Sequence, residues 1–494
     1  MTRLPFHRKA LVLALSLATS YSYATTINVN TNCTLVNAIN NANTDTDTDG
    51  DGGCASGNGA DVINLAPKKN YVLTTVNNHT FGPNGLPSIT SEITINGNQA
   101  TIRRSQTDET PNFRLFHIAA SGQLTLNKLK ISGGHIASNY QYGGGIRNSG
   151  QLTLNNSTIT GNTLLGTGSN GSGIASLYGS HLTLTNSTVS NNTGERGSGL
   201  LNLPGAVAEI NNSTISANRA LNGGVGGIGN SGTLVMRNST VSGNRNIENW
   251  GTGGISNGGS LTLEHCTLSN NSTGYGNVAG INNSGQLTLT NSIIANSNGG
   301  ADCYSHRNYG TLTLTGNSII EDGTCNAVHV GDPKLAPLLD NGGATLTHAF
   351  PAASLAKDLV TTACLTTDQR GIARPQPASQ QCDAGAYERI VTVPNAIKTL
   401  VNFFDQQLDS GGLTYVNSNT LAVHKSVALR NQFITAAQYR AQNQNQQACQ
   451  QLTKALTRID TTGTPASNHY VTGNQASTLT TQITTLRTTW NCGS

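Results

Sequence analysis

The chain has 494 residues, a formal net charge of +4 and 56 glycines, while charged residues make up only 11% and aromatic residues 5%. A helix-rich enzyme of this length would carry about a quarter charged residues. The weak net charge, without a basic run, gives no basis for a nucleic-acid or anionic-lipid partner. Regularly spaced aliphatic residues exclude a disordered chain, so the composition favours a repeat protein.

Residues 1–24 have the features of a secretory signal peptide. Arg3, Arg8 and Lys9 precede an apolar stretch over residues 10–18, and Ser22-Tyr23-Ala24 supplies the small residues of a cleavage site. We predict cleavage after Ala24 and export to the periplasm, the cell surface or the medium. The apolar stretch is too short to span a membrane, and no transmembrane segment is predicted in the mature chain.

Nine cysteines fit an oxidising compartment. No pair has the CxxC spacing of a zinc or redox site, and we predict structural disulfides between sequence neighbours. The pairs are Cys33 with Cys54, Cys303 with Cys325, Cys364 with Cys382, and Cys449 with Cys492. The ninth, Cys266, takes the place of a serine in other repeats and is predicted to be a buried, inert thiol.

Residues 25–120 are predicted to form an N-terminal cap and the first coils of a repeat structure. The segment contains Ile27-Asn28-Val29, a short helix after Cys33, and the strand pattern Asp61-Val62-Ile63-Asn64-Leu65. It resembles the CSLREA domain found ahead of β-helices in secreted bacterial proteins. Val36 and Asn37 replace the Arg and Glu of the family hallmark. The resemblance implies a cap over the exposed end of a solenoid.

Within this cap, Asp45, Asp47, Asp49 and Asp51 alternate along the chain, with Gly50 at the turn. This is the opening of a calcium loop. The twelfth position is Ser56, so a bidentate carboxylate would have to come from elsewhere. Calcium is therefore the one predicted cofactor, and a bare acidic loop inside the Cys33/Cys54 bridge is the alternative.

Residues 121–330 contain a repeat of about 25 to 30 residues, which is typical of a solenoid. The apolar-polar-apolar triplets of the repeat begin at Leu124, Leu152, Leu182, Ala208, Leu234, Leu261, Leu287 and Leu312. Their period-two alternation predicts strands. Three short strands per repeat, separated by Gly and Asn corners, predict an all-β solenoid, namely a right-handed parallel β-helix.

Stacked repeats place equivalent residues above one another. An internal aliphatic ladder is predicted from Ile146, Ile174, Leu200, Ile228, Ile255 and Ile281. A corner ladder is predicted from Asn162, Asn192, Asn218, Asn244 and Asn271. Asn tolerates unusual backbone angles at such a corner, and its amide can bond the turns above and below. A third ladder is predicted from Asn148, Asn202, Asn230, Asn257 and Asn283.

Residues 331–391 are predicted to close the solenoid. The series Asp332-Pro333-Lys334-Leu335, Leu339 to His348, Thr367 to Pro375 and Cys382 to Glu388 resembles the choice-of-anchor Q domain, which implies the end of a right-handed β-helix. We interpret His348, Asp368, Arg370 and Glu388 as a structural ion-pair network rather than an active site. Residues 392–494 show helical spacing and predict a small C-terminal helical domain, whose role as cap, spacer or binding module stays open.

Parallel β-helices often act on polysaccharides, which requires paired carboxylates or an acidic calcium site. Between Glu109 and Asp302 the chain has no aspartate, and Glu209 and Glu264, two repeats apart, are the candidate pair for an inverting hydrolase. No catalytic residue is assigned. The sequence favours an exported, non-enzymatic, adhesin-like protein that binds glycans or cell-envelope components. The alternatives are a polysaccharide lyase or hydrolase and a structural envelope protein.

Overall fold

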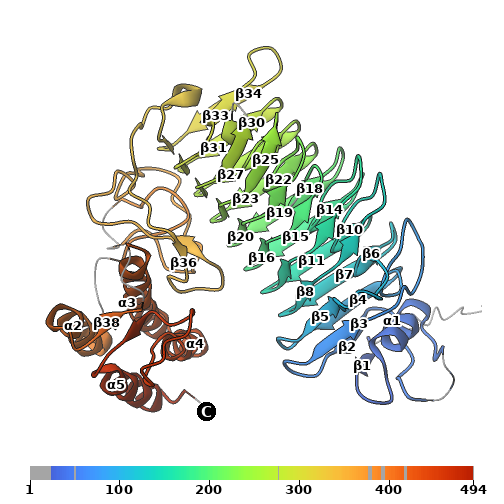
Figure 1. Ribbon diagram of the computed structural model, residues 1–494, viewed down its shortest axis with the longest axis horizontal. Coiled ribbons are helices and arrows are strands. Elements are labelled where there is room, and N and C mark those ends of the chain that lie inside the picture. The colour runs from blue at the N-terminus through green and yellow to red at the C-terminus, as the bar shows by residue number, and fades with distance from the viewer. Residues whose placement is uncertain are drawn as a thin grey trace, which may run out of the picture.

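The computed structural model describes residues 24–48, 50, 52–197, 199–275, 278–376, 381–390, 395–416 and 420–492. Residues 1–23, which hold most of the predicted signal peptide, lie outside the described residues. The chain winds into an elongated parallel β-solenoid from its N-terminal end onward, and its last part folds back beside the coils (Figure 1).

Four parallel sheets, A to D in chain order within a coil, form the solenoid. Sheet A contains β1 (Thr26–Asn28), β2 (Asp61–Asn64), β4 (Glu92–Asn96), β7 (Gln123–Asn127), β11 (Gln151–Asn155), β15 (His181–Thr185), β19 (Val207–Asn211), β23 (Thr233–Arg237), β27 (Ser260–Glu264), β31 (Gln286–Thr290) and β34 (Thr311–Thr315). Sheet B contains β3 (Asn70–Leu73), β5 (Thr101–Arg104), β8 (Lys130–Ser132), β12 (Thr158–Thr160), β16 (Thr188–Ser190), β20 (Thr214–Ser216), β24 (Thr240–Ser242), β28 (Thr267–Ser269), β32 (Ile293–Ala295) and β35 (Ile319–Ile320).

The other two sheets complete each coil. Sheet C contains β9 (His135–Ile136), β13 (Thr163–Leu164), β17 (Thr193–Gly194), β21 (Arg219–Ala220), β25 (Arg245–Asn249) and β29 (Ser272–Tyr275). Sheet D contains β6 (Phe116–Ile118), β10 (Ile146–Asn148), β14 (Ile174–Ser176), β18 (Leu200–Asn202), β22 (Ile228–Asn230), β26 (Ile255–Asn257), β30 (Val278–Asn283) and β33 (Ala301–Ser305). The three predicted strands of a coil are those of sheets A, B and D. The strands of sheet C are an addition that the sequence pattern did not indicate.

The predicted aliphatic ladder is confirmed. Ile146 pairs with Ile174, which pairs with Leu200, and the register continues through Ile228, Ile255 and Ile281. All six side chains are fully buried. Each contributes roughly 1.5 to 3 kcal/mol through its burial, and no coil could bury this face without its neighbours.

The two asparagine ladders are also present, with Asn148 bonded to Ser176 rather than to another asparagine. The predicted amide bonds between turns are confirmed for the first ladder, whereas the predicted unusual backbone angles are not on its asparagines. Asn162 Nδ2 donates to Asn192 Oδ1 at 2.9 Å, and the backbone N–H of Asn162 donates to the same oxygen at 3.0 Å. The left-handed backbone conformation falls on the preceding residue, for example Gly161 and Asn191. The buried amides therefore satisfy backbone groups between coils, which is their structural role. The other ladder runs from Asn202 through Asn230 and Asn257 to Asn283, with bonds of 2.8 to 2.9 Å.

Helix α1 (Leu35–Thr44) lies at the N-terminal end of the solenoid (Figure 1). Thr34 caps the helix, because its hydroxyl accepts a hydrogen bond from the N–H of Asn37 at 3.1 Å. Ala38 and Ile39 are fully buried and belong to the same apolar core as the coils. The helix therefore shields the first coils from solvent and from pairing with another chain.

The last part of the chain contains two two-stranded antiparallel sheets, β36 with β37 and β38 with β39, and a helical module. Its elements are η1 (Thr324–Asn326), β36 (Leu338–Leu339), β37 (Thr347–His348), α2 (Asn395–Ser410), β38 (Thr414–Tyr415), α3 (Thr420–Ala441), α4 (Asn445–Leu456), β39 (Val471–Thr472) and α5 (Ala476–Thr489). The helices enclose a core of their own, in which Phe404 and Phe433 meet edge to face at 5.5 Å. No helix among the described residues has the length and apolar character needed to cross a membrane.

Eight cysteines form the disulfides Cys33–Cys54, Cys303–Cys325, Cys364–Cys382 and Cys449–Cys492. The ninth, Cys266, is buried, and burial raises the pKa of its thiol to about 12. An inert thiol of this kind does not serve as a nucleophile. Four disulfides are typical of a protein in an oxidising, extracellular or periplasmic compartment.

Candidate functional site

The closing segment, residues 331–390, packs on the outer face of sheet B. The side chain of Gln369 donates to Thr214 Oγ1 at 2.9 Å and accepts from Thr240 Oγ1 at 2.6 Å. The backbone N–H of Ala386 donates to Thr267 Oγ1 at 2.9 Å. Thr214, Thr240 and Thr267 are equivalent residues in consecutive coils. Over these coils, the threonine row of sheet B is therefore covered by the chain itself.

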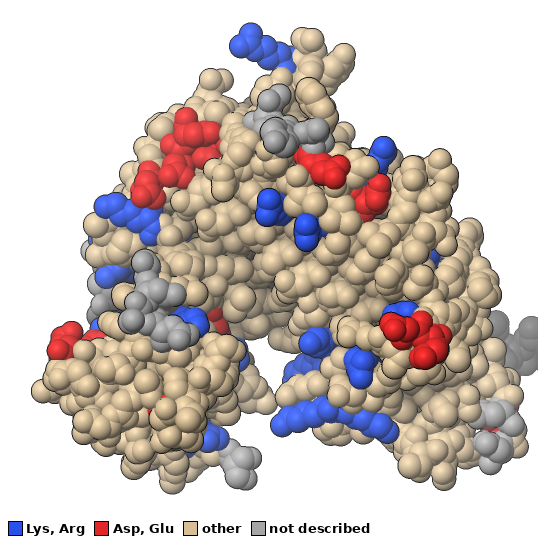
Figure 2. Space-filling model, viewed as in Figure 1, with Lys and Arg blue, Asp and Glu red and all other residues tan. Residues whose placement is uncertain are grey.

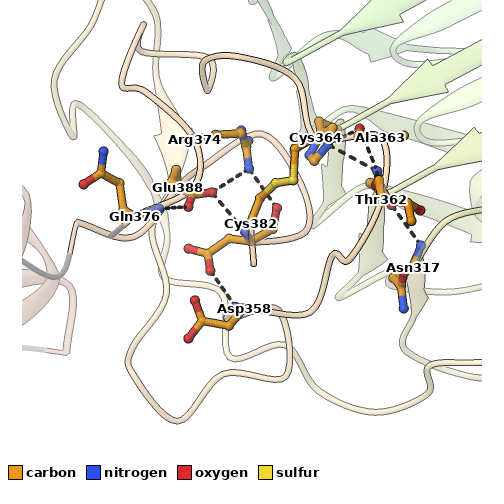
Figure 3. Close-up of a disulfide and its surroundings, with 12 residues drawn as sticks. Asn317, Asp358, Thr362, Ala363, Cys364, Arg374, Gln376, Cys382 and Glu388 are labelled. Atoms are coloured by element: carbon orange, nitrogen blue, oxygen red, sulfur yellow. Dashed lines mark hydrogen bonds and ion pairs between the residues drawn. A yellow bond between two sulfur atoms is a disulfide. The ribbon is translucent and has the colours of Figure 1, made fainter. Parts of the chain in front are cut away.

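Two buried ion pairs hold the closing segment together. Arg370 lies 2.7 Å from Asp368, and Arg374 lies 2.9 Å from Glu388, with all four side chains fully buried. Figure 3 shows the second pair beside the Cys364–Cys382 disulfide, with Gln376 donating its N–H to Glu388. The structural interpretation of these charges fits their burial, because no substrate could reach them.

His348 is not part of the ion-pair network, contrary to our expectation. Its Nδ1 donates to the carbonyl of Ala336, and its Nε2 lies 2.8 Å from Ser242 Oγ on sheet B. Burial lowers the pKa of His348 to about 4, so the ring is neutral and accepts the serine hydrogen bond. His348 therefore fastens the closing segment to the solenoid.

The helical module is fastened to the closing segment in turn. Gln432 Nε2 donates to the carbonyl of Asp340 at 3.0 Å, and Lys454 Nζ donates to the carbonyl of Gly343 at 2.8 Å. The hydroxyl of Tyr439 donates to the carbonyl of Arg370. These contacts hold α3 and α4 at a fixed place beside the first coils of sheet B.

A groove separates α4 from those first coils. It consists of two adjoining cavities, each of about 530 Å³, which share Lys128, Asn156, Thr158, Gln450 and Lys454. Cavities of this size accommodate a small ligand or part of a polymer. The solenoid wall consists of equivalent residues from consecutive coils. The helical wall consists of residues from α4 and from the turn before it.

The groove is positively charged. Lys128 and Lys130 belong to the solenoid wall, and Lys454 belongs to the helical wall. None of the described residues that line the two cavities carries a carboxylate. Lys454 is partly compensated, because its Nζ lies 3.9 Å from Asp340 Oδ2 behind the wall. Figure 2 shows Lys and Arg side chains gathered on the first coils beside the hollow that separates them from the helices.

The uncharged lining consists of hydrogen-bonding side chains. The helical wall contributes Gln444, Gln446, Gln447, Gln450 and Gln451. The solenoid wall contributes Asn156, Asn186, Asn212, Thr158 and Thr188. Each side-chain amide offers hydrogen-bond donors and an acceptor together, which suits a ligand that carries many hydroxyl groups. The lining thus combines positive charge with many neutral polar groups.

The candidate hydrolase pair lies elsewhere. Glu209 and Glu264 are both on the outer face of sheet A, two strands apart and offset by two residues along the strand. Their separation is therefore about 12 Å, longer than the roughly 6.5 to 9.5 Å of inverting enzymes. Glu264 is also paired with Arg237 at 3.0 Å. This geometry does not support a shared catalytic site.

The acidic loop is described only in part, since Asp49 and Asp51 lie outside the described residues. Asp47 accepts hydrogen bonds from the N–H groups of Gly50 and Gly52 at 3.3 and 3.2 Å. Asp45 accepts one from Gly59 at 2.9 Å. Within the part of the chain that the structure describes, no group of three or more His, Cys, Asp or Glu residues could hold a metal ion. Calcium binding stays a prediction.

The groove could not be predicted from the sequence, because its walls are about 300 residues apart in the chain and meet only when the closing segment folds back. One signal was present. The run from Gln442 to Gln451 is rich in Gln and Asn, and such a run on an otherwise amphipathic helix indicates a polar surface with a role beyond packing. The fold and the groove together define the class: a disulfide-linked parallel β-solenoid whose helical module forms one wall of a polar, basic groove.

Comparison with known proteins gives no family. No protein-family model matches the chain, and no curated protein matches it. Among solved structures, a crystal structure of pectate lyase Pel9A matches with 15% sequence identity and a TM-score of 0.43. The match covers 67% of this chain and 88% of that one.

Proposed function

We propose that the protein is an exported binding protein that holds an acidic glycan in the groove between sheet B and α4. The observation that carries the proposal is the lining: lysines on both walls, side-chain amides and hydroxyls between them, and no carboxylate among the described lining residues. Unlike charges attract strongly in a partly enclosed site with few counter-charges. A neutral glycan would not need the lysines, and a cation would be repelled.

The repeat of the solenoid suits a polymeric ligand. Lys128, Asn156 and Asn186 are equivalent corner residues of consecutive coils, about 4.8 Å apart from strand to strand. A sugar chain that runs along the solenoid axis therefore meets the same kind of side chain at each coil. The ammonium groups of Lys128 and Lys130 would pair with uronate carboxylates, while the glutamines of α4 bond ring hydroxyls.

The proposal includes export of the chain across the inner membrane. Cleavage after Ala24 would deliver the chain to the compartment that its disulfides require. The CSLREA-like segment, residues 25–120, and the choice-of-anchor Q-like segment, residues 331–391, would then act as the two closing parts of an extracellular or surface-attached solenoid.

The proposal is tested by titrating the mature protein with hexasaccharides of uronic acids and, separately, of neutral sugars in an isothermal calorimeter. The double variant Lys128→Gln plus Lys130→Gln should weaken uronate binding about tenfold. Lys398→Gln, an exposed lysine on α2, is the matched control and should bind as the wild type does. Equal affinity of the double variant and the wild type, or no uronate binding at all, would overturn the proposal.

The same samples test the enzyme alternative. Incubation with pooled polyuronates and neutral polysaccharides should leave the length of the polysaccharide chains unchanged, because no described residue of the groove lining carries a carboxylate that could act as acid or calcium ligand. Chain cleavage that Glu209→Gln or Glu264→Gln abolishes would instead establish a hydrolase whose site is on sheet A.

A further inference from the structure

A second groove lies on sheet D, far along the solenoid from the first coils. Its volume is about 360 Å³, and its floor is the outward row Leu201, Gly229, Ser256 and Asn282 of consecutive strands. The middle of this floor is Gly229 and Ser256, so the row is lowest there. Turn residues Ser231, Gly258 and Ser284 form one side of the groove.

Trp250 belongs to the opposite side and is unusually exposed. Its side chain and backbone together keep 85% of their surface accessible, although an indole normally buries most of its area. Its φ of 69° is a left-handed value that a bulky side chain rarely adopts. Neither exposure nor this backbone conformation helps the fold, so the position of the ring calls for another explanation.

The segment that follows Trp250 is held tightly. Thr252 donates its N–H to the carbonyl of Gly224 at 3.0 Å, and Thr273 Oγ1 donates to the carbonyl of Gly251 at 3.1 Å. A Cβ on Gly251 would lie 2.2 Å from Gly224 O and 2.2 Å from Asn246 Nδ2, so the backbone there is packed without spare room. The indole is therefore presented from a fixed turn.

We infer that this groove is a separate binding site for a neutral sugar chain, with one pyranose ring stacked on Trp250 and its hydroxyls bonded to Ser256 and Asn282. An indole beside hydroxyl and amide groups matches the two kinds of surface of a sugar ring, an apolar face and a polar rim. A protein partner would need an apolar surround for the indole, and this floor is polar. Arg196 is the single charged residue among the described residues of the lining.

The inference is independent of the basic groove, because the two sites share no lining residue. It gives the protein two sites of different chemistry, one for a charged glycan and one for a neutral glycan. Such a chain could bridge two components of an extracellular matrix or cell wall.

Intrinsic fluorescence provides the test, because the chain contains only two tryptophans and Trp490 is buried. In the Trp490→Phe protein, all indole emission comes from Trp250. Titration with neutral β-1,4-linked gluco- and manno-hexasaccharides should shift the emission to shorter wavelength and saturate. Calorimetry of the wild type should give the same affinity, and Trp250→Ala should weaken it by at least about tenfold.

Two further variants separate binding from folding. Ser256→Val fills the floor and removes a hydroxyl without touching Trp250, and it should also weaken binding. Tyr309→Ala removes another exposed ring that does not line the groove, and it should leave binding unchanged. An unchanged emission with both neutral sugars, or a response only to uronate sugars, would overturn the inference. Loss of uronate binding in the Lys128/Lys130 double variant would leave this result unaffected.

Discussion

Gln369 and Thr214 are 155 residues apart in the sequence, yet the amide of Gln369 donates a hydrogen bond of 2.9 Å to the Thr214 hydroxyl. The same amide bonds Thr345 and accepts from Thr240, so one buried side chain ties the closing segment to two coils. This contact fixes where the chain turns back, and with it the position of the helical wall of the basic groove.

Replacing Gln369 by Leu should therefore destabilise the docked closing segment. The change leaves the buried Thr240 hydroxyl without its acceptor, which costs about 1 to 3 kcal/mol, while the Thr214 hydroxyl keeps its bond to the carbonyl of Leu346. Urea unfolding followed by near-ultraviolet circular dichroism measures the loss. Gln123→Leu, on the exposed outer face of sheet A, is the control and should change stability by less than about 0.5 kcal/mol.

The asparagine ladder that contains Asn162, Asn192 and Asn218, here called the inner ladder, should contribute as much to the stability of the solenoid as its aliphatic core. Asn218 Oδ1 accepts from both the backbone and the side chain of Asn192, and its Nδ2 donates to Val189 O and Asn244 Oδ1. Asn218→Ala should cost about 3 kcal/mol or more, because it leaves a buried backbone N–H unpaired. Asn155→Ala, in the half-buried asparagine row of sheet A, should cost less than about 1 kcal/mol. Equal losses for the two variants would argue against the proposed role of the inner ladder.

Three buried histidines should each reduce the stability of the protein in mild acid. Burial lowers the pKa of His348 to about 4, His117 to about 4 and His265 to about 3. Each ring is neutral in the folded state and gains a proton more readily in the unfolded state. Its contribution to the free energy of unfolding is therefore complete above pH 6.5 and is lost as the pH falls toward 4. For His348 the loss is on the order of 3 kcal/mol. His348→Gln should flatten the curve of unfolding free energy against pH over this range, and an unchanged slope would contradict the assignment.

The Cys449–Cys492 bridge should stabilise the helical module. It closes a loop with a sequence separation of 43 residues. In the chain-entropy model, a cross-link over a loop of that length lowers the conformational entropy of the unfolded chain and so stabilises the folded state by about 4 kcal/mol. Cys449→Ser plus Cys492→Ser should lower the melting temperature of the module, measured by calorimetry. Cys266→Ser restores the residue found in the other coils and should cost less than about 1 kcal/mol. A larger effect of Cys266→Ser would show that the thiol packs in a way a serine cannot reproduce.

The solenoid could be predicted from the sequence because its information is local and repeated. Leu152 and Leu154 face inward for the same reason in every coil, so one alternation pattern, repeated at a nearly constant spacing, gives strands, register and core together. The strands of sheet C escaped the prediction, because four of the six contain only two residues, which are too few to show a period.

The candidate site could not be predicted in the same way. Lys128 and Gln450 become neighbours only because Gln369, His348 and Lys454 fasten the returning chain. Those contacts are single, non-repeating pairs across large sequence separations. A pattern within one coil contains no information about them. The pattern within one coil likewise predicts Thr214 and Thr240 to be exposed, whereas the closing segment covers both of them.

Hydrogen exchange with a bound uronate hexasaccharide is the sharpest test of glycan binding between sheet B and α4. We predict slower exchange in two segments at once, residues 128–130 at the solenoid wall and residues 444–454 at the helical wall, with little change on the outer face of sheet A. Slower exchange on sheet A around Glu209 and Glu264, or no change at either wall while calorimetry reports binding, would contradict the account.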